Sequence, residues 1–445
     1  MHCRIKKLLR NKVTVMLVLT IIILISLRFL ILPFSPPGFF IDEAASGAHV
    51  IAMVMHYTNA YGQVWPFFSQ SLDGGFTTPI YLYPLTLWAT IFGFSEFALR
   101  AFSQFLTVLS ILIMAIGMQL WLGKRFGLVT AIVGLAIPWG WLQGSIAWDP
   151  AMVPLFVSGA FLGWSLINTR TSGKARLTGF ILLPLSLSLL AYVYPPYWAV
   201  VPFLTIGAYT SLFIGKHIRI RQIILSLCSM ALVAIPLVIF ITSPASLGRA
   251  SAVSIFLNTS IFGAIGLFIH NIVLLIEPFF LFIYGDFNMR HSVGWQGMLG
   301  LAALVPILVV VIVIIKKLLH TKNIVSTRAE LYLVVVGAAG FLISCIGSAL
   351  TSEGQPQSLR ASGAWPFALI IIVIGWVFLL RHKAKWLKWS AIIIFIVATV
   401  AYSIDLRFFY PAQSAKAFDE PVRVDIFNGQ PVQYSRLAQE YYRNR

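Results

Sequence analysis

Apolar runs long enough to cross a lipid bilayer recur along the whole chain, and they leave little choice of fold. A spanning helix needs about 20 mostly apolar residues, because the hydrocarbon core is about 30 Å thick and a helix rises about 1.5 Å per residue. Only 10% of the 445 residues are charged and the mean hydropathy is +0.88, whereas an ordinary soluble domain is about one quarter charged. The sequence therefore predicts an all-α, polytopic integral membrane protein.

Short clusters of Lys and Arg separate the apolar runs and predict which span ends face the cytoplasm. Six clusters hold about two thirds of the 32 Lys and Arg residues: the N-terminus, 124–125, 170–176, 216–221, 316–328 and 381–388. The positive-inside rule places these clusters, and with them the N-terminus, in the cytoplasm. Of the 14 Asp and Glu residues only Glu330 lies near a cluster, so the acidic residues are predicted on the extracytoplasmic side. The net charge of +18 then reflects membrane orientation and indicates no nucleic-acid partner.

About eleven spans satisfy this charge pattern, with a range of 10–13. They are expected near residues 13–34, 96–122, 126–146, 151–168, 178–194, 198–214, 223–241, 298–315, 329–349, 365–380 and 388–404. Two more apolar stretches, 77–94 and 258–284, would begin and end on the outer side as interfacial or re-entrant helices, although each could instead cross. The chain then divides into a membrane domain over 1–404, with outer loops 35–95 and 242–297, and an extracytoplasmic tail over 405–445. The first run lacks a cleavage motif and is predicted to be a retained anchor.

The first outer loop holds the most informative stretch, IDEAASGAHVIAMVMHY, in which Asp42 and Glu43 open a helical pattern. Acidic side chains are favoured at a helix start by the free N–H groups and the helix dipole, which is a purely structural explanation for both. The functional alternative is a carboxylate held just above the membrane as a general base. His49 and His56 follow on the same face, but seven residues of helix span about 10 Å, too far for one metal ion. We expect both histidines to face polar headgroups.

Other charged residues lie in further segments on the predicted outer side. Glu96 follows the helix cap Ser95, and Arg100 lies at i+4, so the two are expected either to pair at the end of a span or to contact a substrate. Asp149 either caps a span or binds a substrate or a metal. Long ordered loops tend to be functional, and the loop 243–298 contains Arg249, His270, Glu277, Asp286, Arg290 and His291. The hairpin YVYPPYWAV is predicted to be an interfacial aromatic turn without chemistry.

The order of these motifs resembles the GT-C membrane glycosyltransferases, in particular the branch with protein O-mannosyltransferases and the bacterial lipid A aminoarabinose transferase. The matching stretches are IDEAASGAHV, TTPIYLYPLTLWATIFG, FSEFALRAFS, GSIAWDPAMVPLF and QSLRASGAWPFALII. The resemblance covers the first 170 residues well, the region around 355–380 loosely, and the middle only by topology. It implies a transferase that takes a sugar from a polyprenyl-phosphate carrier on the extracytoplasmic face and inverts the anomeric centre. A soluble nucleotide-sugar donor is not expected, because no Gly-rich phosphate loop is found.

Carried over residue by residue, the resemblance implies Asp42 as the general base, with Glu43 and Asp149 as further catalytic acids. The expected substrate-binding residues are Glu96, Arg100, Arg249, Arg290, His291 and Arg360. One departure matters: many relatives carry Lys-Pro-Pro-Leu before the second span, where the lysine meets phosphate, but this chain reads Thr77-Thr78-Pro79-Ile80. Phosphate must then meet other cations, namely Arg249, Arg290, His270, His291 or Arg360. Asp42 and Asp149 are also the candidates for holding a divalent cation, and no other cofactor is expected.

The relatives' sizeable soluble C-terminal domain has no counterpart here, so a lipid or glycan acceptor is expected, with a protein left open. Two other kinds of membrane protein also stay open. A transporter or lipid flippase would place charges in mid-span at repeat interfaces, whereas these carboxylates lie at outer ends and no two-fold repeat is visible. A glycan polymerase or ligase also takes lipid-linked donors but relies on outer-loop arginines and a histidine. We expect the chain in the plasma membrane, the inner membrane of a bacterium, surrounded by membrane lipids.

Overall fold

The computed structural model describes residues 2–70, 76–169, 173–243, 246, 253–257, 259–319 and 328–418; of residues 2–11 and 41 it describes the backbone only. Helices dominate, and the one sheet in these residues is a two-stranded hairpin, β1 (Ser69–Gln70) with β2 (Phe76–Thr77). The helices are α1 (His2–Ile31), α2 (Ile41–His56), α3 (Pro79–Phe92), α4 (Glu96–Leu122), α5 (Lys124–Ala136), α6 (Pro138–Gly144), α7 (Val153–Thr169), α8 (Lys174–Val193), α9 (Tyr197–Ile214), α10 (Ile220–Ile241), α12 (Ile261–Ile276), α13 (Leu301–Leu318), α14 (Arg328–Ala349), α15 (Ala364–Arg381), α16 (Lys385–Phe408) and α17 (Tyr410–Phe418). Two short turns complete the set, a 3₁₀ helix η1 (Asp149–Met152) and a π-helix η2 (Phe279–Ile283). The all-α prediction is confirmed.

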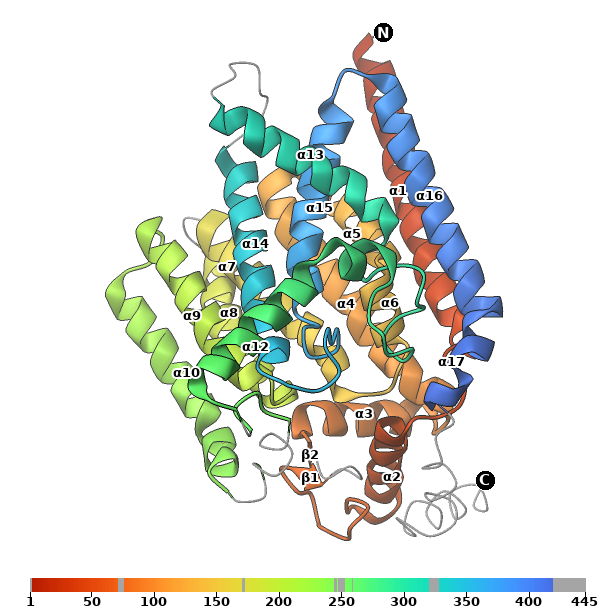
Figure 1. Ribbon diagram of the computed structural model, residues 1–445. Helices are drawn as coiled ribbons and strands as arrows, with labels where there is room; N and C mark the ends of the chain where they lie inside the picture. Colours follow the sequence, from red (N-terminus) through yellow and green to blue (C-terminus); the bar gives the residue numbers. More distant parts are fainter. Residues whose placement is uncertain are drawn as a thin grey trace.

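The helices form one bundle with α15 in its interior, where nearly every residue from Ala364 to Leu379 is buried. Figure 1 shows α2, α3 and the β-hairpin at the end of the bundle opposite the N-terminus, which we call the site end. By contrast, α10 buries little of its surface, and its large exposed hydrophobic residues are Ile, Leu and Val. Such a face is suited to lipid, because lipid tails solvate apolar side chains that water would not.

Eleven helices in the described residues are long and apolar enough to cross a membrane, so the chain is an integral membrane protein. The number agrees with the prediction, but two members differ. The predicted span 126–146 is two helices, α5 and α6, bent by 62° at the break between them. The stretch 258–284 contains α12, which together with η2 passes the length and hydropathy test for a span. The stretch 77–94 contains α3, which at 14 residues is shorter than a span.

The break between α5 and α6 has a clear cause in Pro138, which has no N–H and forces the preceding residue into an extended conformation. The break leaves the carbonyl of Leu135 without its helical partner, because the N–H of Trp139 donates to Met298 instead. Arg28 of α1 supplies donors: its Nε lies 2.9 Å from the oxygen of Leu135, and its Nη1 lies 3.3 Å from that of Gly140. A buried arginine from the first helix therefore bridges both sides of the broken one, and α6 turns the chain toward Asp149.

The middle of α12 lies at the site end of α14. The side-chain amide of Asn271 donates to the carbonyls of Ala349 and Thr351, at 3.1 and 3.0 Å. Ser254, just before α12, pairs with Thr351 through an antiparallel bridge. The predicted tail begins inside α16, which continues to Phe408, and α17 follows; residues 419–445 lie outside the described part of the chain.

Candidate functional site

A buried ion pair between Glu43 and Arg100 ties together the elements around the start of α2. Arg100 donates from Nε to Oε1 and from Nη2 to Oε2 of Glu43, both at 2.8 Å, and Glu43 is fully buried. The same guanidinium donates to the carbonyls of Pro36 and Gly38 in the loop before α2, at 2.8 and 2.7 Å. Such a two-pronged contact fixes both orientation and distance. Arg100 was expected either to pair with Glu96 on its own helix or to contact a substrate, and its close carboxylate partner is Glu43.

Glu43 also accepts hydrogen bonds from two backbone N–H groups, one near Asp42 and one near Asp149. Its Oε2 accepts from Phe40 at 3.1 Å, which closes the N-terminus of α2, and its Oε1 accepts from Ala147 at 2.9 Å. Asp42 is the neighbour of Glu43 in α2, and Asp149 lies two residues after Ala147 at the start of η1. One carboxylate thus positions both acidic residues from segments about one hundred residues apart in sequence.

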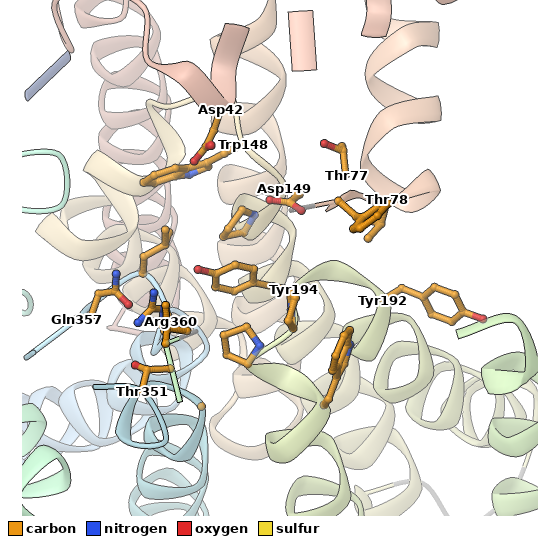
Figure 2. A pocket seen from close by; sticks show the side chains of 18 of the residues that line it. Asp42, Thr77, Thr78, Trp148, Asp149, Tyr192, Tyr194, Thr351, Gln357 and Arg360 are labelled. Carbon is orange, nitrogen blue, oxygen red and sulfur yellow. The ribbon is translucent and has the colours of Figure 1, made fainter. Parts of the chain in front are cut away.

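Asp42 and Asp149 line a cavity of about 460 Å³ at the site end of the bundle. That volume lies in the range of small-molecule pockets, about 300–1,000 Å³. Figure 2 shows the two carboxylates on one side of the cavity, Asp42 beside Trp148 and Asp149 near Thr77 and Thr78. We call this side the acidic wall. Thr77 and Thr78 are the residues that stand where relatives place a phosphate-binding lysine.

Three cationic or potentially cationic side chains line the same cavity: Arg290, His291 and Arg360. We call these three residues together the basic wall. The guanidinium of Arg290 stacks over the ring of Phe40, 4.0 Å from its centroid, and Arg360 is buried with a loose contact of 3.7 Å to the exposed carboxylate of Glu353. The basic wall is built from loops that follow η2 and α14, far in sequence from the acidic wall.

His291 is held by a buried carboxylate that the sequence analysis did not select. Its Nδ1 lies 3.0 Å from Oδ2 of Asp286, and both side chains are buried. Burial by itself would raise the pKa of Asp286, but His291 and hydrogen bonds from Ser358 and Asn288 outweigh it, so the pKa lies below the ordinary value. Asp286 is therefore ionised at neutral pH. Its place in the middle of the long loop gave no distinguishing sequence signal.

Tyr194 lies between the two walls, and the prediction that its hairpin has no chemical role does not fit its position. Tyr192, Tyr194 and Trp198 line the cavity, and Figure 2 shows the Tyr194 ring between Asp149 and Arg360. Burial raises the pKa of Tyr194 to about 12; Arg360 opposes the shift, whereas Asp149 and Asp42 add to it. Tyr194 is thus neutral at physiological pH and within electrostatic range of both walls. Its aromatic neighbours in the sequence were typical of a membrane interface and gave no sign of this position.

His49 does not face lipid headgroups, as the sequence suggested, but is buried and structural. Its Nδ1 accepts from the N–H of Ala60 at 3.2 Å, and its Nε2 donates to the carbonyl of Gln70 at 3.0 Å. Burial lowers its pKa to about 4, although the bond to Gln70 opposes the shift. A neutral His49 therefore fastens the loop after α2 to the helix.

Of the nine predicted site residues, five line the cavity: Asp42, Asp149, Arg290, His291 and Arg360. Glu43 and Arg100 lie behind the acidic wall as a positioning pair, and Glu96 is exposed at the start of α4 and does not line the cavity. Arg249 lies outside the described residues. His270, a further candidate cation, is exposed on α12 and does not line the cavity.

The fit of a divalent cation can be judged from the ligands available. In the part of the chain that the structure describes, no three or more His, Cys, Asp or Glu side chains group as a metal site would require. Within these residues, Asp42 and Asp149 provide two carboxylates without a third protein ligand.

Similarity to known proteins is found at the level of structure. No protein-family model and no curated relative matches the sequence. The fold is similar to that of ArnT from Cupriavidus metallidurans bound to undecaprenyl phosphate, with a TM-score of 0.53 and 13% identity over 96% of this chain and 75% of that one. It is also similar to the apo oligosaccharyltransferase of Archaeoglobus fulgidus, with a TM-score of 0.51 and 14% identity over 96% of this chain and 59% of that one, so this chain spans less than two thirds of its length. The chain shares the fold of these GT-C membrane glycosyltransferases, as the motif order implied.

Proposed function

We propose that this chain transfers a sugar from a polyprenyl-phosphate-linked donor to a hydroxyl group of a lipid or glycan acceptor. The observation that carries the proposal is one cavity that Asp42 and Asp149 line together with Arg290, His291 and Arg360. That combination matches a reaction in which a proton leaves the acceptor while negative charge develops on a phosphate. The shared fold with ArnT, bound to undecaprenyl phosphate in its structure, supports the choice of donor.

The basic wall would bind the phosphate of the donor. Arginine guanidinium groups bind phosphate oxygens through two parallel hydrogen bonds, and they keep their charge at all physiological pH values. Arg290 and Arg360 would thus take over the role of the lysine that is replaced by Thr77-Thr78 in this chain. The apolar side of the cavity, which includes Phe68, Phe76 and Phe240, would accept the first part of the prenyl tail, because such rings offer no partner to a polar group.

The acidic wall would activate the acceptor. In the proposed step, the acceptor hydroxyl gives its proton to the Asp42 carboxylate as its oxygen forms a bond to the anomeric carbon. The bond from that carbon to the phosphate oxygen breaks, and its electron pair stays with the phosphate, so polyprenyl phosphate leaves. Asp42 then releases the proton to water. Attack opposite the carrier inverts the anomeric centre, and general-base help of this kind contributes about 10²–10⁴ in rate.

Asp149 and Tyr194 would orient the acceptor between the two walls. A carboxylate can accept hydrogen bonds from sugar hydroxyls, and a neutral tyrosine can both donate and accept. The site end of the bundle would face the extracytoplasmic side, because the basic clusters and the N-terminus belong to the other end. In a bacterium this orientation corresponds to the outer face of the inner membrane.

The decisive experiment replaces Asp42 by Asn, which keeps size and shape but removes the base. The donor is first identified as the lipid-linked sugar that accumulates in cells lacking the gene. The purified variant should transfer this sugar about 10²–10⁴ times more slowly than the wild type and still bind undecaprenyl phosphate. Glu96→Gln, exposed and outside the cavity, is the matched control and should retain full activity.

Two outcomes would contradict the proposal. Full transfer by a folded Asp42→Asn protein would remove the assigned base. Movement of an intact lipid-linked sugar across proteoliposomes by the wild type, without any transfer product, would instead identify a flippase.

A further inference from the structure

Asp286 makes more hydrogen bonds than a single loop contact requires. Its Oδ2 accepts from Nδ1 of His291 at 3.0 Å and from both the N–H and the hydroxyl of Ser358, at 2.8 and 2.9 Å. Its Oδ1 accepts from the N–H of Asn288 at 2.8 Å. Burying an ionised carboxylate is costly unless it is fully hydrogen-bonded. Asp286 satisfies this condition and joins two separate loops, 284–300 and 351–363.

Each of these bonds fixes a member of the basic wall. His291 is held directly, and with its Nδ1 engaged it has Nε2 left for a partner in the cavity. Ser358 lies two residues before Arg360, so the bonds to Asp286 also anchor the loop that carries this cation. Asn288 lies two residues before Arg290, and its side-chain oxygen accepts from the N–H of Arg290 at 3.0 Å. One buried carboxylate therefore connects to all three cations of the wall.

The contact with Asp286 also determines which ring nitrogen His291 can offer to a ligand. Nδ1 is engaged by Asp286, so Nε2 is the ring nitrogen left for a partner in the cavity. Trp148 lies against the ring, 5.7 Å away between ring centroids, and the charged residues that line the same cavity are Asp42, Asp149, Arg290 and Arg360.

We infer that Asp286 is the positioning residue of a phosphate subsite, in which Nε2 of His291 hydrogen-bonds to a phosphate oxygen of the donor beside Arg360. This inference rests on the proposed function for the identity of the ligand, a polyprenyl phosphate. It adds an assignment that the overall reaction does not require: the phosphate is recognised by a carboxylate-backed histidine in place of the missing lysine. The arrangement parallels metal sites, where a carboxylate behind a histidine sets its tautomer and ring orientation.

The test measures binding of two probes to the purified full-length protein in detergent. Undecaprenyl phosphate reports on the phosphate, and undecaprenol, which lacks it, reports on the prenyl tail. The variants are Asp286→Asn, His291→Gln and the double variant, and melting temperatures verify that each is folded. Both single variants should weaken undecaprenyl phosphate binding about tenfold or more, as expected for losing a hydrogen bond to a charged group. Undecaprenol binding should change less than about twofold, because no charge is involved.

Comparing the binding loss of the double variant with the losses of the two single variants distinguishes an action through His291 from a merely structural role of Asp286. If Asp286 acts through His291, Asp286→Asn should weaken binding of undecaprenyl phosphate strongly in the wild type. In the His291→Gln background, the same substitution should weaken it much less. Fully additive losses, or equal losses for undecaprenol, would overturn the inference. Unchanged phosphate binding in His291→Gln, combined with lost transfer, would assign His291 to proton transfer instead.

The two proposals can fail separately. If wild-type protein does not bind undecaprenyl phosphate, the proposed donor is wrong and this subsite falls with it. If the wild type binds undecaprenyl phosphate and transfer depends on Asp42, but Asp286→Asn binds as tightly as the wild type, only the subsite is wrong.

Discussion

The carboxylate of Glu43 and the guanidinium of Arg100 meet through two hydrogen bonds of 2.8 Å, although 57 residues separate them in the chain. This pair is buried. Glu43 also accepts hydrogen bonds from the N–H of Phe40, at the N-terminus of α2, and from the N–H of Ala147, two residues before Asp149. Asp42 and Asp149 therefore both depend on one ion pair that does not line the cavity. Removing the pair should disturb the fold and the site together.

Replacing Glu43 by Ala is expected to lower the free energy of unfolding by about 3–5 kcal/mol, because it leaves a buried guanidinium without its partner. The melting temperature of the purified protein in detergent measures this change. Glu96→Ala is the control, since Glu96 is exposed in the first turn of the same helix as Arg100. It should change the stability by less than about 1 kcal/mol. Equal effects of the two substitutions would show that Glu96 supports Arg100 as much as Glu43 does.

Replacing Arg28 by Met should destabilise the protein by about 2–3 kcal/mol, because two carbonyls at the α5–α6 break lose their donors. Arg28 is fully buried and lies over the ring of Trp141, 4.9 Å from its centroid, so packing is lost as well. Arg125→Met, on the exposed start of α5, provides the comparison and should be nearly neutral. A melting temperature for Arg28→Met within error of the control would mean that the break does not need its arginine.

Lowering the pH should reduce the stability of the protein, because His49 must be neutral in the folded state. Burial lowers its pKa from 6.5 to about 4 in the folded protein, so the unfolded chain binds a proton that the folded one does not. The stability that depends on a neutral His49 is complete above pH 6.5 and is lost as the pH falls toward 4, by up to about 3 kcal/mol.

The measurement compares melting temperatures of the wild type and His49→Gln at about pH 7.5 and about pH 5. Gln lacks a titrating group, so the variant should lose about 2 kcal/mol less than the wild type over this interval. Carboxylates such as Asp286 contribute equally to the pH dependence of stability in both proteins, so their effect cancels in the comparison. An identical pH dependence of the two proteins would refute the assignment to His49.

Gly375 of α15 lies against the backbone of α13, and Ala there should cost about 1–3 kcal/mol. A Cβ at this position would lie 2.1 Å from the carbonyl oxygen of Pro306, so the two helices would have to move apart. Gly207 of α9 is a matched control, because a Cβ there would meet only Ile343, at 3.9 Å. Gly207→Ala should be neutral or stabilise by up to about 1 kcal/mol. If both variants melt at the same temperature, the α13–α15 contact is looser than described.

The sequence was a good guide to fold class and to the residues of the two walls. Asp42 and Asp149 stood out because each is an acidic residue at the start of a helix next to a long apolar run. Arg290, His291 and Arg360 stood out as charges in outer loops of a chain that has few. The structure brings these five around one cavity; their roles in catalysis and binding stay predictions until the variants are measured.

The positioning groups could not be found in this way. Glu43 was read as a second catalytic acid and Arg100 as a partner of Glu96, because the sequence displays only neighbours along one helix. Asp286 had no motif, and Tyr194 was hidden among aromatic residues typical of an interface. The structure breaks the span predicted over 126–146 into two helices at Pro138. The prediction missed this break because hydropathy, averaged over a window, does not register one proline.

By itself, the sequence determined that the chain is a bundle of membrane helices and which end of the bundle carries the charges suited to a site. Hydrophobicity and charge act locally, through the lipid or water that each segment meets, so they can be read along the chain. Only the tertiary structure decided that Glu43 pairs with Arg100 and Asp286 with His291 and Ser358. Such pairs form where packing brings distant backbones within about 3 Å of a hydrogen-bonding partner, and that distance depends on every helix in between.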